Sequence, residues 1–220
     1  MQQIYKNILI RIFPTLFSLQ STFRFLIRYP KSYLNTTGWL ESNRRQYPCK
    51  PDGSPLPWLN YPTIALLEKR LDKKHLLFEY GSGYSTLFFA NLVSGIVSVE
   101  YDKEWLDRIK SMQPKNAVVH HVSNDIDGKY CRSILSSETN YHIILIDGRD
   151  RINCIKQSIK KLTDDGVIIF DDSQRSEYQE AQSFMKDLGF LHLELEGLKP
   201  NGFESDSASI FYRRNNCLGL

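Results

Sequence analysis

The sequence predicts an α/β protein built on a parallel sheet with helices on both faces. From residue 75 onward, short and nearly continuous apolar stretches alternate with helix-like stretches. Such apolar strands are typical of parallel sheets buried on both sides. Near the carboxyl end, two more strand-like stretches follow each other with no convincing helix between them, which predicts an antiparallel hairpin that closes the sheet.

The expected elements follow in chain order. The expected strands are 75–80, 96–100, 117–122, 142–147 and 166–171, with hairpin strands at 190–196 and 208–213. The expected helices are 85–93, 103–112, 128–136, 151–163 and 176–188. Pro62 suits the first turn of one further helix, whose residues Ile64, Leu67 and Leu71 recur at the spacing of a buried face.

Composition limits the class of protein. A chain of 220 residues with 41% hydrophobic and 24% charged residues is ordinary for a soluble globular protein, and a net charge of +3 gives no reason to expect nucleic acid as a partner. The four cysteines are scattered without metal-binding spacing, which favours reduced thiols in the cytoplasm. The Pro- and Gly-rich stretch 48–62 predicts a connector, so we expect an extension over 1–47 and a main domain over 48–220.

The extension is basic and apolar. Residues 1–40 contain five basic residues and no acidic one, so the other 180 residues carry −2 in net charge. Arg11 and Pro14 interrupt the apolar run, which argues against a signal peptide and a membrane-spanning helix. Two interpretations of residues 4–28 remain: a segment lying on an anionic membrane surface, or a helical arm packing on its own domain or on a second subunit of a homo-oligomer.

A glycine loop follows the first expected strand, in the stretch Phe78–Thr86 (FEYGSGYST). Gly81 and Gly83 allow a tight turn and close approach to a ligand. A dinucleotide loop has a third small residue where this chain has Thr86, and Glu79 would repel a pyrophosphate. Glu79 instead suits a ligand with an ammonium group, such as S-adenosylmethionine (SAM). The alternative is a strand-end carboxylate in a local ion pair.

Further acidic residues follow the next two expected strands. Glu100 ends the second strand, where a carboxylate can accept both ribose hydroxyls. After the third strand, Asp125 is expected to meet the adenine amino group, with Asn124 and Asp127 as alternatives. We also assign the adjoining Ser82, Ser85 and Tyr101 to the cofactor site.

The order and spacing of these pieces over residues 62–213 resemble the class I SAM-dependent methyltransferases. The resemblance includes the E-x-G-x-G loop, the acid ending strand two, LIDG, GVIIFDDS and the terminal hairpin. It implies a Rossmann-like, seven-stranded, mostly parallel sheet, SAM over strands one to three, and acceptor chemistry near strands four and five. Ser85 stands where many members have a third glycine, and we expect it to be the N-cap of the next helix.

Three acids at the ends of strands four and five are candidates for chemistry: Asp147, Asp171 and Asp172. They are expected to converge, and three interpretations are open. They bind Mg²⁺ or another divalent cation, as in the cation-dependent O-methyltransferases, although those usually have an amide where this chain has Asp172. Alternatively, Asp147 or Asp172 is a general base. In the third interpretation they only cap a helix and order a turn.

The surroundings of these acids are also open to two interpretations. Arg149, Arg151 and Arg175 either neutralise the acids or recognise an acidic acceptor. Four aromatic residues either wall an acceptor pocket or belong to the core: Trp58, Tyr61, Tyr84 and Tyr178.

The sequence therefore predicts a SAM-dependent methyltransferase that favours O-methylation of a small-molecule or glycan-like acceptor. Asp147 is the best single candidate for catalysis, followed by Asp172. The alternatives are an aminopropyltransferase-like enzyme, or a SAM-binding or interaction domain without activity.

Overall fold

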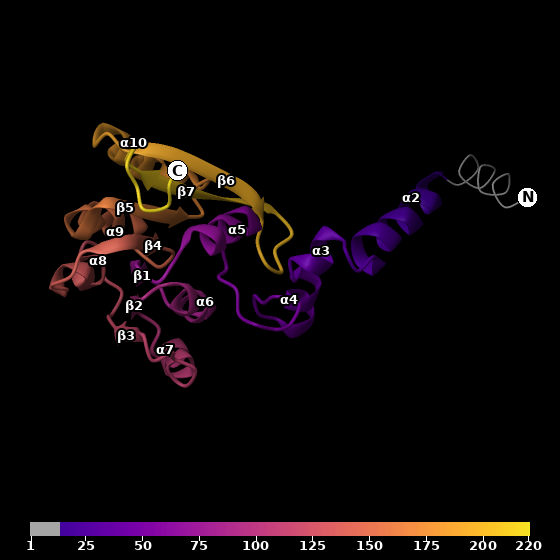
Figure 1. The fold of residues 1–220 in the computed structure, drawn as a ribbon, viewed down its shortest axis with the longest axis horizontal. Helices are drawn as coiled ribbons and strands as arrows, with labels where there is room; N and C mark the ends of the chain where they lie inside the picture. Colours follow the sequence, from indigo (N-terminus) through magenta and orange to yellow (C-terminus); the bar gives the residue numbers. More distant parts are fainter. Residues whose placement is uncertain (1–13) are drawn as a thin grey trace, which may run out of the picture.

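A seven-stranded sheet with helices on both faces forms the body of the protein (Figure 1). The computed structural model describes residues 14–220. The strand order is β3-β2-β1-β4-β5-β7-β6; β1 to β5 run parallel, and the β6–β7 hairpin is antiparallel. This confirms the predicted fold class. The strands are β1 (Leu76–Tyr80), β2 (Gly95–Glu100), β3 (Ala117–His121), β4 (Tyr141–Ile146), β5 (Leu162–Asp171), β6 (Leu191–Leu198) and β7 (Ser205–Tyr212).

The helices lie close to the expected positions. The α-helices are α2 (Pro14–Thr22), α3 (Tyr33–Thr36), α4 (Trp39–Arg45), α5 (Tyr61–Arg70), α6 (Tyr84–Leu92), α7 (Lys103–Lys110), α8 (Lys129–Arg132), α9 (Arg151–Ser158) and α10 (Gln179–Asp187). A π-helix, η1 (Phe23–Arg28), and 3₁₀ turns η2 (Ser133–Ser136), η3 (Ile159–Lys161) and η4 (Ser176–Tyr178) complete them. The helix expected over 151–163 is shorter, because Leu162 is already paired with Tyr141 as the start of β5.

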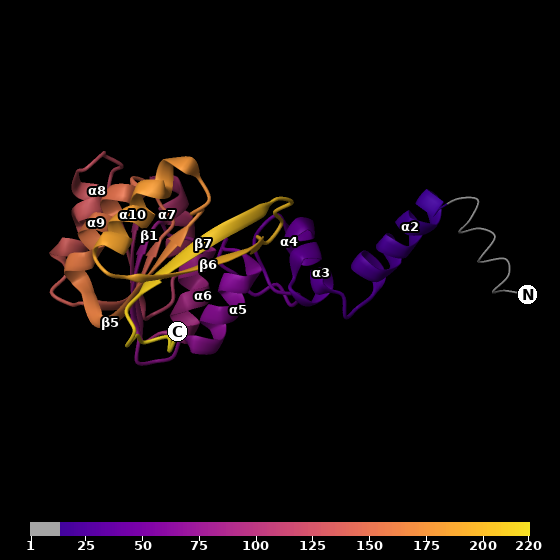
Figure 2. The same ribbon diagram turned by 90° about the horizontal axis from the view of Figure 1, so that it is seen from above.

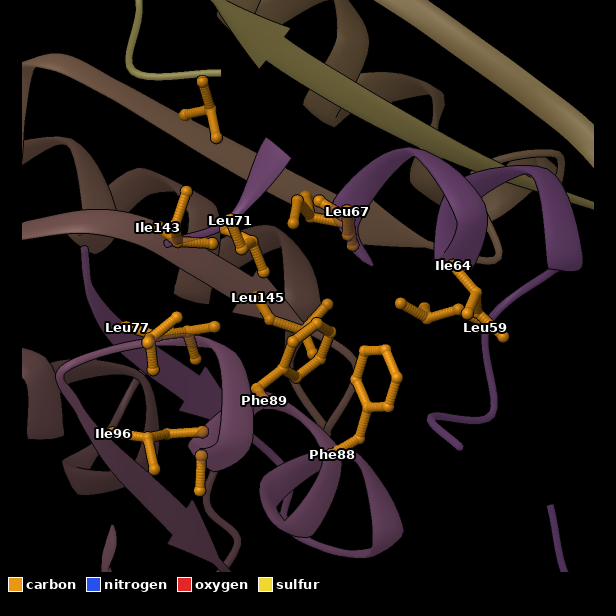
Figure 3. Close-up of a cluster of buried hydrophobic side chains, with 14 of the residues drawn as sticks. Leu59, Ile64, Leu67, Leu71, Leu77, Phe88, Phe89, Ile96, Ile143 and Leu145 are labelled. Atoms are coloured by element: carbon orange, nitrogen blue, oxygen red, sulfur yellow. The ribbon is translucent and has the colours of Figure 1, made fainter. Parts of the chain in front are cut away.

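The core lies on both faces of the sheet because its strands are apolar on both sides. In β4, Ile143 and Leu145 belong to the cluster under α5 and α6, whereas Ile144 and Ile146 belong to the cluster under α8, α9 and α10. Successive strand residues point to opposite faces, so a strand buried on both sides is apolar throughout. Figure 3 shows the first cluster, to which Leu67 of α5, Phe89 of α6 and Leu145 of β4 all belong. Each such buried leucine stabilises the fold by about 1.5–3 kcal/mol.

The carboxyl ends of β1 and β4 are brought into contact by two glycines. Gly81 has a φ of +90°, and a Cβ there would come within 3.2 Å of the Gly148 Cα. A Cβ on Gly148 would come within 2.9 Å of the Gly81 nitrogen. The Asp147 N–H also donates to the Tyr80 carbonyl at 3.1 Å. The loops after β1 and β4 therefore meet at the point where chain connections leave the sheet in opposite directions, which is where α/β sheets bind ligands.

The amino-terminal segment divides into a packed part and a projecting part. Trp39 in α4 packs against the core, and its Nε1 donates to the Gly202 carbonyl at 2.7 Å. By contrast, α2 and η1 project from the body in two perpendicular views (Figures 1 and 2). The described part of segment 4–28 therefore does not pack on its own domain; residues 4–13 lie outside the described residues. None of the helices described between residues 14 and 220 is long and apolar enough to cross a bilayer.

Candidate functional site

The glycine loop connects β1 to α6 and closes on itself. Gly83 is the N-cap of α6, and its N–H donates to Thr86 Oγ1 at 3.0 Å. The N-cap expected at Ser85 is therefore wrong. Ser85 lies in the first turn of the helix, where its hydroxyl donates to Glu79 instead. The hydroxyls of Ser85 and Thr86 therefore hold the loop in place, with its backbone at the edge of the sheet.

Glu79 lies beneath the loop rather than in an open cavity. It is 1% exposed, and besides the Ser85 hydroxyl it accepts from Thr86 Oγ1 at 2.6 Å and Ser98 Oγ at 2.7 Å. Burial raises the pKa of Glu79 to about 7, against the opposing effect of the three hydroxyl donors. The structure thus shows neither a local ion pair nor a cavity-facing carboxylate. Ser85 is the group that stands between Glu79 and the ligand crevice.

Glu100 lines a polar cavity of about 290 Å³. Its Oε2 accepts from the Ser82 N–H, and its Oε1 from the N–H groups of Tyr101 and Asp102, all at 2.9 Å. These backbone donors fix the carboxylate, while further lone pairs remain for hydroxyl donors. The lining residues are Gly81, Ser82, Ser85, Glu100, Tyr101, Asp102, Trp105, Asp147, Gly148, Arg149 and Arg151. The structure therefore brings together most of the residues predicted to bind the cofactor.

The outer rim of the polar cavity is formed by a cation–aromatic pair. Arg149 lies 5.2 Å from the Tyr101 ring centroid, and its Nη2 donates to the Tyr101 hydroxyl at 3.0 Å. This contact was not predicted, because the two residues are 48 positions apart.

Asp125 does not line either cavity of the crevice. Its two oxygens accept from the backbone N–H groups of Lys129 at 2.7 Å and Tyr130 at 2.9 Å, which lower its pKa. These bonds cap α8. In this structure the carboxylate serves the local turn, as short polar residues after strands often do, and its contact with adenine stays a prediction.

A second cavity, of about 470 Å³, adjoins the first. Its lining residues are Gln46, Tyr47, Pro48, Trp58, Ser82, Gly83, Tyr84, Ser85, Trp105, Arg108, Asp147 and Asn201. Aromatic rings form much of this wall. Tyr47 stacks on Tyr84 with centroids 5.0 Å apart, and Trp105 Nε1 donates to the Ser82 carbonyl at 2.7 Å. Gly83, predicted for the cofactor, lines this aromatic cavity instead.

Sequence reasoning identified this wall only in part. Trp58 and Tyr84 line it as one interpretation expected, whereas Tyr61 is buried in the core and Tyr178 packs against Phe170. Trp105 and Tyr47 were missed. Trp105 lies in the first turn of α7, whose N-cap is Asp102. Its position shortly after β2 was the only indication in the sequence that it could reach the site.

The acids Asp147, Asp171 and Asp172 converge as predicted, with one carboxylate oxygen from each within 4.8 Å of the others. Cations already occupy this cluster. Lys199 Nζ lies 2.8 Å from Asp171 Oδ2 and 2.7 Å from Asp172 Oδ1. Arg151 lies 3.0 Å from Asp147 and 3.2 Å from Asp172, and Arg175 lies 2.6 Å from Asp172. Neutralisation by Arg151 and Arg175 is confirmed, whereas Lys199 was missed.

The cluster does not fit a divalent metal. Carboxylate oxygens suit Mg²⁺, but the Lys199 and Arg151 cations already lie among these oxygens and would repel a further cation. The tentative assignment of Asp147, Asp171 and Asp172 as metal ligands is corrected for this reason. The same cations would also repel a polyamine, so nothing favours the aminopropyltransferase alternative.

The acids differ in their access to the crevice. Asp172 is 4% exposed and lines neither cavity. Burial alone would raise its pKa, but Lys199 and Arg151 lower it below its usual value. Such a group is a poor proton acceptor, which corrects its assignment as a catalytic base. The Asp147 side chain is 26% exposed and lines both cavities, and burial raises its pKa against the effect of Arg151.

We compared the chain with protein families, curated proteins and solved structures. No protein-family model matches the sequence, and a search of curated proteins finds no relative. Solved structures do match. A precorrin 8W decarboxylase of Methanobacterium thermoautotrophicum superposes with a TM-score of 0.54 at 17% identity, covering 77% of this chain and 97% of that chain. A methyltransferase-like protein of Silicibacter pomeroyi gives 0.52 at 22% identity, covering 72% and 89%.

A third match is the O-methyltransferase TomG of Streptomyces achromogenes, solved in complex with SAM, with a TM-score of 0.51 and 12% identity over 68% of this chain and 77% of that chain. At such identities the likeness concerns the fold, and enzymes with the same fold differ in the reaction and the acceptor. This chain has the fold of the class I SAM-dependent methyltransferases.

Proposed function

We propose that this protein is a SAM-dependent methyltransferase that methylates an oxygen atom of a small-molecule or glycan-like acceptor. The observation that supports it best is the pair of adjoining cavities, which share Ser82, Ser85, Trp105 and Asp147. Methyl transfer is an in-line displacement, so donor and acceptor must lie next to each other in a fixed orientation. One polar and one aromatic cavity at the carboxyl edge of the sheet meet that requirement.

The polar cavity suits the donor. SAM supplies a methyl group activated by a sulfonium. Glu100 is placed to accept the ribose hydroxyls, and the backbone at Gly81 permits close approach. Ser85 lines the same cavity and would contact the methionine tail, and the buried Glu79, which accepts from the Ser85 hydroxyl, would act through it. The amino-terminal end of α6 favours the negatively charged carboxylate of that tail.

The aromatic cavity suits the acceptor. Tyr47, Trp58 and Tyr84 offer flat surfaces for a planar ring or the apolar face of a sugar, and Arg108 and Asn201 offer polar contacts. Asp147 lies at the junction of the cavities, where it is placed to accept the proton of an acceptor hydroxyl. Because a hydroxyl must lose its proton on methylation, this position favours O-methylation.

The division of the chain at residue 47 is part of the proposal. Tyr47 closes the acceptor cavity, so the extension contributes one wall of a site built mainly by residues 48–220. The four cysteines are free thiols, which suits a reducing compartment such as the cytoplasm.

Calorimetry with SAM, S-adenosylhomocysteine and NAD tests the donor site. We expect the two SAM-related ligands to bind and NAD not to bind. Glu100→Gln should weaken SAM binding about 10- to 100-fold, because hydrogen bonds to a charged group contribute about 1.5–3 kcal/mol. Binding of NAD in place of SAM would contradict the proposal. Transfer of labelled methyl from SAM into a cell extract distinguishes an enzyme from a binding domain.

A further inference from the structure

Residues 14–31, here called the arm, present an apolar surface that the other residues described, up to 220, leave uncovered. Figures 1 and 2 show α2 and η1 extending away from the sheet. Leu16, Leu19 and Phe23 are 65%, 63% and 57% exposed, and they recur at intervals of three and four residues. This spacing places them along one side of the helix. Phe25 and Leu26 are also exposed. An apolar surface of this kind marks an interaction site.

The charge of the arm limits its partner. Arg24, Arg28 and Lys31 are basic, and the sequence has no acidic residue between positions 14 and 40. Two copies of the arm would bring like charges together, which opposes a homodimer through this surface. A surface of anionic phosphate groups complements the charge.

A groove on the arm combines the two features. It has a volume of about 570 Å³ and is lined by Gln20, Phe23, Arg24, Phe25, Arg28, Tyr29 and Pro30. One guanidinium group can donate two parallel hydrogen bonds to two oxygens of a phosphate. Aromatic side chains occupy the boundary between headgroups and acyl chains. The groove therefore offers both kinds of contact that a phospholipid headgroup region requires.

The carboxyl end of η1 is already satisfied by the chain itself. Ser32 Oγ donates to the Leu26 carbonyl at 2.8 Å. Asn35 Nδ2 donates to the carbonyls of Ile27 at 2.8 Å and Tyr29 at 3.0 Å. These bonds join the arm to α3, so its backbone needs no protein partner at this end. The parts of the arm that remain uncovered are its apolar and basic side chains.

We propose that the arm binds the surface of an anionic phospholipid bilayer. Leu16, Leu19 and Phe23 enter the interfacial region, while Arg24 and Arg28 contact lipid phosphates. An apolar face with basic residues beside it is the arrangement of helices that lie in the membrane interface. This proposal does not depend on methyl transfer, and it makes the protein peripheral to the membrane.

Vesicle flotation of the full-length chain tests it. The probes are vesicles of phosphatidylcholine alone and vesicles that also contain phosphatidylglycerol. We expect flotation with the anionic vesicles, weaker flotation at high salt, and little with phosphatidylcholine alone. The double variant Arg24→Gln, Arg28→Gln should partition about 30-fold less well, since each basic residue near the surface contributes about 1 kcal/mol.

A matched control removes two exposed basic residues from the body, Lys69→Gln and Lys186→Gln, and should float like the unmodified protein. If this control lost as much flotation as the arm variant, only the overall charge of the protein would matter, and the proposal would be overturned. A second variant, Leu16→Ser with Leu19→Ser, should also reduce flotation. Flotation that neither arm variant alters would overturn it. So would a concentration-dependent dimer in light scattering that the arm variants abolish, with no binding to vesicles.

Discussion

The Lys199 ammonium lies 2.8 Å from Asp171 Oδ2, inside the cluster where a bound cation would be expected. Lys199 follows β6 directly, and Asp171 ends β5, so a residue at the start of the hairpin loop completes the charge balance at the sheet edge. Burial alone would lower the pKa of Lys199, but Asp171 and Asp172 raise it above its usual value. The amine is therefore charged, and it links the hairpin to the crevice.

Lys199→Met should destabilise the protein by about 3–5 kcal/mol, because it removes the closest cation from the buried Asp171 carboxylate, whose other basic neighbour, Arg151, lies 3.8 Å away. Lys199→Arg keeps the charge and is the control. Urea denaturation measures the difference. Burial raises the pKa of Asp171. Protonation of Asp171 at acid pH should therefore reduce the loss of stability that Lys199→Met causes. An equally stable Met variant at neutral pH would show that the network does not stabilise the fold.

Methyl transfer should not depend on a divalent metal, because Lys199 and Arg151 occupy the acid cluster. Once an acceptor is found, turnover should be the same with EDTA and with added Mg²⁺. A loss of turnover with EDTA that Mg²⁺ restores would contradict this expectation.

Asp147→Asn should reduce turnover about 10²- to 10⁴-fold, the usual contribution of a general base. SAM affinity should change much less, because our proposal assigns most of the contacts to SAM to Glu100 and the glycine loop, which line the polar cavity. Burial raises the pKa of Asp147, and a base acts only when deprotonated. Turnover of the unmodified protein should therefore fall as pH decreases, with a midpoint above the usual aspartate value. Unimpaired turnover in the Asn variant would remove Asp147 from the mechanism.

Glu79→Gln should flatten the pH dependence of stability. The folded-state pKa of Glu79, about 7, is above the ordinary glutamate value of 4.5, so the folded state retains a proton that the unfolded state loses. The contribution of Glu79 to stability is therefore greatest at acid pH and is lost as pH rises toward 7. Relative to the Gln variant, the unmodified protein should lose on the order of 3 kcal/mol between about pH 5 and about pH 8. Urea denaturation at both pH values measures this.

The same variant tests how Glu79 acts on the ligand. Because its partners are hydroxyls and it faces no cavity, Glu79→Gln should weaken SAM binding less than Glu100→Gln does. The opposite order in calorimetry would indicate a direct contact between the Glu79 carboxylate and the ammonium.

The sequence alone determined the sheet, the glycine loop and the places of Glu100 and Asp147. Apolar strands and intervening helices define a parallel sheet, and the carboxyl ends of its parallel strands lie at one edge, so acids that follow separate parallel strands must meet there. Asp147 and Asp171 converge for this reason, although 24 residues separate them in the chain.

Only the tertiary structure decided which partner each of these groups has. Lys199, Tyr47 and Trp105 come to the site from the hairpin loop, the extension and α7, and no local pattern specifies those contacts. Glu79 accepts from the hydroxyls of Ser85 and Thr86 in its own loop and of Ser98 in the neighbouring strand, and only the folded loop shows that these groups surround it. Strand direction is set by short-range patterns of apolar residues, whereas the pairing of charges and the closing of a cavity depend on how distant loops fold over the sheet edge.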